Sequence, residues 1–265
     1  MFSVIFPGQG SQTVGMGKDF YIKYDRVKKL FNQADEVLKF PISDLILNGP
    51  KDKLDLTENT QPAIFLISYS IFNVIKNEHG INLNNAKYFA GHSLGEYSAI
   101  AASDVINFEE ALKILKIRGR SMQTAVPRGV GGMLAILGSE IEKVESVITK
   151  SNCEIANDNS NGQIVVSGNL KDLDDLILKL KQLNIKNIKL PVSAPFHCNL
   201  MNKATTIMSE EINKLNFKIG QNKLISNVTA NEIKEQNEIK ALLIKQIENR
   251  VRWRESVINM IQSGV

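Results

Sequence analysis

Cysteine is scarce in this sequence of 265 residues, where only Cys153 and Cys198 occur and no CxxC pair is present. Two cysteines in a chain of this length do not make a disulfide framework, which indicates reduced thiols in a reducing compartment. No apolar run approaches the ~20 residues that span a bilayer. Residues 1–7 also lack the basic and apolar segments of a signal peptide. We therefore expect a cytoplasmic protein without membrane association.

The sequence also has little excess of either positive or negative charge. Lys and Arg number 32 against 28 Asp and Glu, which leaves a formal net charge of +4, and the lysines are dispersed along the chain. This distribution argues against a nucleic-acid partner. The hydrophobic share of 43% and the charged share of 23% are typical of a globular protein. The length suits one large domain, alone or with a small one.

Short apolar runs alternate with amphipathic stretches in the first half of the chain. Strands are expected at 2–6 and 87–90, and helices at 27–38, 62–76, 94–102 and 108–125. Strands that alternate with helices predict a parallel sheet covered on both faces. After Ala125 the texture changes at the glycine-rich stretch 127–132, which we interpret as a linker.

The segment after this linker predicts a second, smaller domain. Its expected elements are a strand at 133–137, a helix at 140–150, strands at 153–156 and 163–167, a helix at 171–183 and a strand at 187–190. This β-α-β-β-α-β order is the ferredoxin-like arrangement. A helix at 199–214, a strand at 223–228 and one final helix at about 239–261 follow. We expect a large α/β domain of residues 1–126 and 198–265, interrupted by a small domain at 127–197.

The segment 91–95 (Gly-His-Ser-Leu-Gly) lies between a predicted strand and a predicted helix. This is the nucleophile-elbow pattern, in which glycines permit a strained turn that exposes the serine hydroxyl. Ser93 is therefore the candidate nucleophile. The backbone N–H of Leu94 lies at a helix N-terminus, where it can donate to a developing oxyanion. A tight glycine turn with a serine cap is the alternative.

A nucleophilic serine needs a base, and the chain offers three histidines. His92 adjoins Ser93, so its side chain should point away from the serine hydroxyl. His79 lies at a probable helix C-terminus, where histidine is common. His197, in a proline-stiffened loop, is the best candidate. No acid between Ser93 and His197 stands out as a third member, so a Ser–His pair oriented by a backbone carbonyl is plausible.

The helix at 108–125 indicates a substrate. Arg118 falls in its apolar stripe, three residues after Leu115 and four before Met122, whereas Arg120 falls on the polar face. A buried guanidinium needs a partner. An internal Asp or Glu is one candidate. The other is a substrate carboxylate, which arginine holds in bidentate fashion.

The first glycine loop, 8–12 (Gly-Gln-Gly-Ser-Gln), follows the first predicted strand. It fails as a dinucleotide fingerprint because the third glycine is absent and no ribose-binding acid is evident. We interpret it as a loop beside the nucleophile turn, where the backbone N–H of Gln9 can be a second oxyanion donor.

Together these segments resemble the malonyl-CoA:acyl carrier protein transacylases, the malonyl-loading family of bacterial fatty acid synthesis. The matching segments occur in the family's order over most of the chain. They are 6–12 (Phe-Pro-Gly-Gln-Gly-Ser-Gln), 91–96 (Gly-His-Ser-Leu-Gly-Glu), 118–123 (Arg-Gly-Arg-Ser-Met-Gln), 162–168 (Gly-Gln-Ile-Val-Val-Ser-Gly) and 195–197 (Pro-Phe-His). The resemblance implies an α/β-hydrolase-like core with an inserted ferredoxin-like subdomain.

The resemblance also implies roles for individual residues. Ser93 would carry the malonyl group, His197 would be its base, and Arg118 would hold the malonyl carboxylate. The backbone amides of Gln9 and Leu94 would form the oxyanion hole. The further implied positions are Phe196 as the malonyl-selecting residue, Asn157 and Asn159 as residues facing the substrate cleft, and Arg252 as the residue that orients the histidine.

The implied reaction moves a malonyl group from malonyl-CoA to the phosphopantetheine thiol of acyl carrier protein. We expect a monomer that needs no metal or redox cofactor. Members of the family continue for several tens of residues beyond the position matching Val265, so we expect weaker packing of the large domain here. Two alternatives stay open: a serine esterase or thioesterase, and an inactive module that only binds the carrier protein.

Overall fold

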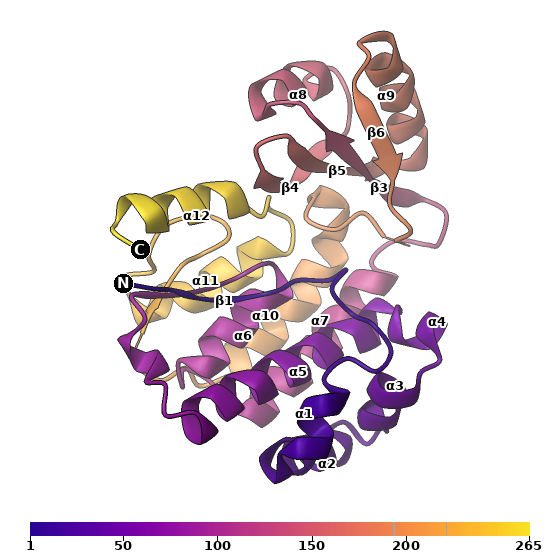
Figure 1. Cartoon of the computed structure of the whole chain (residues 1–265). Coiled ribbons are helices and arrows are strands. Elements are labelled where there is room, and N and C mark those ends of the chain that lie inside the picture. Colours follow the sequence, from indigo (N-terminus) through magenta and orange to yellow (C-terminus); the bar gives the residue numbers. More distant parts are fainter. Residues whose placement is uncertain (193, 221) are drawn as a thin grey trace.

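The computed structural model describes residues 1–192, 194–220 and 222–265. It contains a three-stranded parallel sheet and a four-stranded antiparallel sheet. We call residues 131–189, which hold the antiparallel sheet, the small unit and the remainder the large unit. Figure 1 shows the small unit at the top and the helices of the large unit gathered below it. The predicted α/β class is confirmed.

The parallel sheet has the order β1-β2-β7, with β1 at Val4–Phe6, β2 at Tyr88–Gly91 and β7 at Lys223–Leu224. All four residues of β2 are buried, as expected for the central strand of a covered parallel sheet. Because strands β1 and β2 run in the same direction, the loop at 7–12 and the turn at 92–93 lie at the same edge. This edge holds the candidate nucleophile.

Helices cover this sheet and supply most of the core. They are α1 (Lys18–Lys23), α2 (Asp25–Leu38), α3 (Ile42–Asn48), α4 (Lys51–Leu54), α5 (Thr57–Glu78), α6 (Leu94–Ala102), α7 (Phe108–Thr124), α10 (Asn202–Lys214), α11 (Gln236–Gln246) and α12 (Trp253–Gln262). Short 3-10 helices lie at Leu83–Asn85 and Asn199–Met201. Among the described residues, none of the helices has both the length and the apolar character that crossing a membrane requires.

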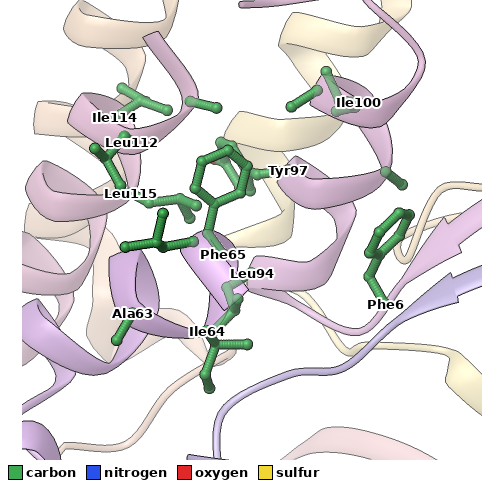
Figure 2. Packing of buried hydrophobic residues seen from close by; sticks show 14 of the residues in the cluster. Phe6, Ala63, Ile64, Phe65, Leu94, Tyr97, Ile100, Leu112, Ile114 and Leu115 are labelled. Carbon is green, nitrogen blue, oxygen red and sulfur yellow. The ribbon is translucent and has the colours of Figure 1, made fainter. Parts of the chain in front are cut away.

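The long helices α5, α6 and α7 pack together beneath the nucleophile turn. Figure 2 shows Phe65 from α5 beside Tyr97 from α6, with Leu112 and Leu115 from α7 close by. Helices α5 and α7 approach so closely that a Cβ on Gly119 would lie 2.5 Å from the carbonyl oxygen of Thr57. This close approach brings polar residues of both helices to the serine.

The small unit contains β3 (Gly131–Leu137), α8 (Ile141–Ile148), β4 (Glu154–Ser160), β5 (Gln163–Asn169), α9 (Leu170–Gln182) and β6 (Lys186–Lys189). Its strands have the order β4-β5-β3-β6, and every neighbouring pair is antiparallel. One sheet face packs on α8 and α9 in a separate apolar cluster. Met133, Ala135 and Val165 belong instead to the core of the large unit.

The C-terminal region differs from the prediction. The single helix expected at 239–261 is two helices, α11 and α12, separated by residues 247–252. In that break the backbone of Val251 pairs with β4, donating to the Ala156 carbonyl and accepting from the Asp158 amide. The predicted strand at 223–228 is also shorter, because the chain turns after Ile225 and places Asn227 at the serine. Pairing between distant segments therefore prevails over local helical and strand preference here.

Candidate active site

The predicted strand-turn-helix arrangement around Ser93 is confirmed. Ser93 lies between β2 and α6 with φ 54° and ψ −109°, a conformation that side-chain-bearing residues rarely adopt. A Cβ on Gly91 would lie 1.9 Å from the Gly95 carbonyl oxygen, and one on Gly95 would lie 2.5 Å from the Phe6 carbonyl oxygen. Gly91 is therefore required by the close approach of β2 to the start of α6, and Gly95 by the packing of α6 on the end of β1.

His197 lies at the serine, as its selection among the three histidines predicted. Its Nε2 is 2.8 Å from Ser93 Oγ, and its Nδ1 is 2.8 Å from the backbone carbonyl oxygen of Gln246. A carbonyl oxygen can only accept, so Nδ1 carries the proton and Nε2 is free to accept from the serine. The base is thus oriented by a backbone carbonyl, one of the arrangements that the sequence left open.

The electrostatic setting keeps His197 neutral. Burial, with a smaller contribution from the Arg118 charge, lowers the pKa of His197 to about 3. A neutral imidazole is the form that accepts a proton, so this site holds its base ready over the whole neutral range. His197 itself has φ 57°, so both members of the pair are held in uncommon backbone conformations.

Arg118 is buried, with 1% of its surface exposed, and Arg120 is exposed, as the phase of the helix predicted. One terminal nitrogen donates to Gln61 Oε1 at 2.9 Å. The other donates to Gln246 Oε1 at 2.7 Å and to Ser93 Oγ at 3.0 Å. Within the described ranges these partners are amide and hydroxyl oxygens rather than carboxylates, and Arg118 Nε has no partner.

Two neighbouring side chains, Tyr97 and Glu96, stabilise the buried positive charge of Arg118. Burial lowers the pKa of Arg118, and the neighbouring Tyr97 and Glu96 oppose this shift. The guanidinium carbon lies 5.5 Å from the centre of the Tyr97 ring, within the range of a cation–π contact. An unpaired Nε and a hydroxyl that other groups can replace leave this guanidinium able to take an additional anionic partner.

Four site residues escaped the sequence reasoning: Gln61, Glu96, Asn227 and Gln246. Asn227 Oδ1 accepts the Ser93 amide at 2.7 Å, and its Nδ2 donates to the Gly91 carbonyl at 2.7 Å, so it braces both ends of the turn. Gln246 was assigned to the middle of a continuous helix. Glu96 did carry a signal, because it is the one charged residue in the small apolar segment 94–102.

The orienting role predicted for Arg252 is wrong. Gln246 supplies the carbonyl at His197 Nδ1, because α11 ends there and turns toward β4. Arg252 instead caps α12: its backbone N–H donates to the Asn227 carbonyl at 3.0 Å, and its Nε is 3.2 Å from Glu255 Oε1. It nevertheless lines a cavity of about 450 Å³ that also borders His197.

The two other histidines lie where the sequence placed them. His92 Nε2 is 2.8 Å from Asn159 Oδ1, so its side chain faces the small unit rather than the serine hydroxyl. His79 caps α5 at its C-terminus and contacts the Tyr24 hydroxyl at 3.0 Å. The Asn159 amide oxygen is therefore occupied by His92, while Asn157 is buried on β4 beside Val251. Substrate contacts by either asparagine stay a prediction.

The remaining predicted residues lie around the serine. The Gln9 loop packs on the nucleophile turn, since a Cβ on Gly8 would be 2.8 Å from the His92 carbonyl oxygen, and the Gln9 side chain donates to Thr57 Oγ1 at 3.3 Å. Leu94 is the first residue of α6. Phe196 is buried, and its carbonyl accepts from Ser167 Oγ at 2.6 Å. Their roles toward substrate stay predictions.

A second cavity, of about 440 Å³, runs along β1 and α5. Its lining is mostly apolar, has no titratable side chain and does not include Ser93, His197 or Arg118, so it supplies no base to activate the serines that line it. Among the residues that the structure describes, no cluster of three or more His, Cys, Asp or Glu side chains is arranged to hold a metal ion.

A buried serine–histidine pair on a strained turn defines a covalent acyl-transfer site. The family model described as "Acyl transferase domain" matches residues 3–264, and the chain belongs to this acyl transferase family. The family-level prediction made from the sequence is confirmed.

The names of similar proteins indicate a particular kind of acyl transferase. The malonyl CoA-acyl carrier protein transacylase of Bacillus subtilis is 40% identical over 98% of this chain and 83% of its own length. The protein of the same name from Staphylococcus aureus is 37% identical over 99% of this chain and 85% of its own length. The crystal structure of acyl-carrier-protein-S-malonyltransferase from Bartonella henselae is 38% identical, with a TM-score of 0.96 over 100% of this chain and 86% of that chain.

Proposed function

We propose that this protein transfers a malonyl group from malonyl-CoA to the phosphopantetheine thiol of acyl carrier protein through a malonyl ester of Ser93. The observation that carries the proposal is the meeting of three groups: Ser93 Oγ lies 2.8 Å from His197 Nε2 and 3.0 Å from an Arg118 nitrogen. The hydroxyl oxygen of the nucleophile is thus in hydrogen-bond contact with both its base and a cation that can bind a carboxylate. The names of the relatives point to the same reaction.

In the first half of the reaction, Ser93 Oγ attacks the thioester carbonyl and its proton passes to His197 Nε2. The tetrahedral intermediate then collapses, the carbon–sulfur bond breaks, and the leaving sulfur takes the proton from Nε2. In the second half the phosphopantetheine thiol gives its proton to Nε2 and attacks the serine ester. The ester carbon–oxygen bond then breaks, and Ser93 Oγ takes the proton back from Nε2. The sum is one acyl group moved between two thiols, with no oxidation and no metal or redox cofactor.

The backbone amides of Gln9 and Leu94 are the proposed oxyanion donors. Leu94 begins α6, so its N–H has no acceptor within the helix and lies at the positive end of the helix dipole. The Ser93 amide is engaged by Asn227 Oδ1 at 2.7 Å and is therefore not a donor in this scheme. Donors aimed at a developing oxyanion contribute about 3 kcal/mol each in comparable acyl-transfer sites.

Selectivity for malonyl follows from Arg118. A malonyl carboxylate can replace the serine hydroxyl as partner of the guanidinium, whereas an acetyl group leaves the cation without an anion. We assign Phe196 to the wall of the acyl site, and Asn157 and Asn159 to the face that the small unit turns toward the substrate. These assignments rest on the family resemblance, on the contact of Asn159 with His92, and on the position of Phe196 next to His197 in the chain.

We also propose a domain description. The parallel sheet with its helices matches an α/β-hydrolase-like core, formed by residues 1–126 and 198–265. The strand order of the small unit suits a ferredoxin-like insert at 127–197. A monomer in the cytoplasm, where an acyl carrier protein is at hand, is the state in which we expect the protein to act.

The decisive experiment is intact-mass analysis after mixing the protein with malonyl-CoA. We expect one malonyl adduct on Ser93 that disappears when acyl carrier protein carrying phosphopantetheine is added, with malonyl-carrier as the product. Rapid release of free malonate without a thiol acceptor would instead identify a thioesterase. Absence of any adduct would leave an inactive carrier-binding module as the better description.

A further inference from the structure

A single carboxyl group is buried behind the nucleophile turn. Glu96, in α6, is 1% exposed in a helix whose nine residues are all buried. Its Oε2 accepts from Gln246 Nε2 at 2.6 Å and from the backbone N–H of Asn227 at 3.2 Å, while its Oε1 has no partner among the described residues. The reaction described above makes no use of this carboxyl group, although burying one is costly.

Gln246 connects this carboxyl group to the reacting residues. Its side-chain nitrogen donates to Glu96 Oε2 and, at 3.1 Å, to the Ser93 carbonyl. Its side-chain oxygen accepts from Arg118 at 2.7 Å, and its backbone carbonyl faces His197 Nδ1 at 2.8 Å. One residue thus contacts the nucleophile's backbone, the base and the cation.

The contacts fix which way the Gln246 amide points. Two oxygen atoms, Glu96 Oε2 and the Ser93 carbonyl, face its nitrogen, and an amide rotated by half a turn would bring three acceptors together. The same rotation would point the NH₂ group at the Arg118 guanidinium, which can only donate. Glu96, which makes the shorter of the two contacts to the Gln246 nitrogen, therefore acts with the Ser93 carbonyl to turn the Gln246 oxygen toward Arg118.

We propose that Glu96 is a positioning residue: by holding the Gln246 amide in one orientation, it keeps Arg118 aligned for the carboxylate of the acyl group. The inference rests on the proposed malonyl transfer, in which Arg118 receives that carboxylate. Glu96 reaches the nucleophile by a second route, because Asn227, whose backbone it holds, braces the Ser93 turn. It does not contact the substrate, and its effect passes entirely through Gln246 and Asn227.

Acceptance of hydrogen bonds, rather than charge, is the property that this role needs. Burial raises the pKa of Glu96 to about 7, with the contacts from Gln246, Asn227 and Arg118 opposing the shift. A proton on the unpartnered Oε1 leaves Oε2 as the acceptor for both donors. Glutamine can place its carbonyl oxygen at the same position, whereas methionine has the length but no comparable acceptor.

The test compares Glu96→Gln with Glu96→Met, and measures the ratio of kcat/KM for malonyl-CoA to kcat/KM for acetyl-CoA with acyl carrier protein as acceptor. Partial unfolding lowers both rates equally and leaves the ratio unchanged. We expect the methionine variant to lose at least about tenfold in the ratio, and the glutamine variant to stay within about threefold of wild type. Ser98→Ala, which removes a buried hydroxyl without a partner from the same helix, is the matched control and should leave the ratio unchanged.

An unchanged malonyl-to-acetyl ratio in Glu96→Met would overturn the inference. A fall in Glu96→Gln as large as that in Glu96→Met would also overturn it, because the negative charge of Glu96 would then be the property that matters. If the methionine variant does not fold, Glu96→Asp replaces it, because it retracts the acceptor by one methylene and should show the same fall. Wild-type protein that transfers no malonyl group would contradict the proposed function itself, so the two failures are distinguishable.

Discussion

The interiors of the two units differ in kind. The hydrophobic cluster between the small sheet and helices α8 and α9 consists of Leu, Ile, Val and one Cys side chain, and the fully buried polar residues of the small unit, Asp158 and Ser167, bond instead to Arg254 and to the Phe196 carbonyl of the large unit. The interior of the large unit buries Arg118, Glu96, Asn227 and Gln246 together with its apolar residues. Buried polar groups destabilise a core unless they are paired, and these four are joined by hydrogen bonds into one network.

The large unit holds the reacting groups, and the small unit holds residues around them in place. The small unit contributes three contacts around the site: the pairing of β4 with Val251, the Asn159 contact that holds His92, and the Ser167 hydroxyl that donates to the Phe196 carbonyl. Every group within hydrogen-bond distance of Ser93 Oγ or of the His197 ring comes from the large unit as bounded here. Substitutions in the two interiors should therefore change different measurements.

The largest effect is expected for Ser93→Ala. Removing the hydroxyl deletes the atom that is acylated, so the malonyl adduct should be absent and kcat should fall at least about 10,000-fold. The free energy of unfolding should stay close to that of wild type, since alanine occupies the same strained backbone conformation. A residual adduct on the variant, found by intact-mass analysis, would show that another residue is acylated.

Arg118→Ala should change selectivity next most strongly. Loss of the cation removes the partner of the malonyl carboxylate, and the malonyl-to-acetyl ratio of kcat/KM should fall about 100-fold. Arg120→Ala, two residues further along on the exposed face of α7, is the matched control and should leave the ratio unaltered. Equal behaviour of the two variants would contradict the carboxylate-binding role.

Leu176→Ala probes the small unit's apolar interior. Leu176 is fully buried on α9, so its truncation should lower the free energy of unfolding by about 3 kcal/mol in denaturant titrations. The malonyl-to-acetyl ratio of the folded fraction should not change. Leu178→Ala, on the exposed side of the same helix, is the control and should alter neither quantity. A shift in selectivity in Leu176→Ala would break the separation between the two interiors.

The smallest expected effect is the pH dependence that His197 brings to stability. Its pKa is about 3 in the folded protein and near 6.5 when unfolded, so between these values only the unfolded state takes up the proton. Stability from this group is present above pH 6.5 and is lost as the pH falls. Between pH 7 and pH 5, the free energy of unfolding of wild type should fall by about 2 kcal/mol more than that of His197→Ala.

The control for this measurement is His79→Ala. His79 is exposed and lies at the C-terminal end of α5, so this variant removes a histidine outside the Ser93–His197 pair. Parallel pH curves for wild type and His197→Ala, measured by denaturant unfolding, would show that His197 is not held neutral by burial.

Much of this architecture was predictable from local patterns. The nucleophile turn, the inward phase of Arg118 and the element order of the small unit follow from glycine spacing and helical or strand periodicity. Gln246 and Asn227 could not be found in this way. Gln246 takes its role from a helix break that arises where Val251 pairs with the distant strand β4. Asn227 lies in a local turn closed by Ser226 and Asn231, and only the tertiary contact of this turn with Ser93 gives it a role.

Two of the missed residues differ in what the sequence could reveal. Gln61 is one polar side chain on α5, and only the approach of α7 at Gly119 explains its position. Glu96 was visible as an isolated acid in an apolar helix, but its partners were not. Sequence periodicity identifies a buried charge, whereas the groups that satisfy it depend on tertiary contacts.

The hydrogen bonds of Arg118 also bear on how such a protein can change its substrate over evolutionary time. The residue is held by Gln61 from α5 and Gln246 from α11, so replacing it alone strands two buried amide oxygens. Replacing Arg118 alone should therefore change selectivity at a cost in stability, and recovering that stability requires changes at Gln61 and Gln246 as well. The three positions are thereby coupled, so their substitutions should not be additive.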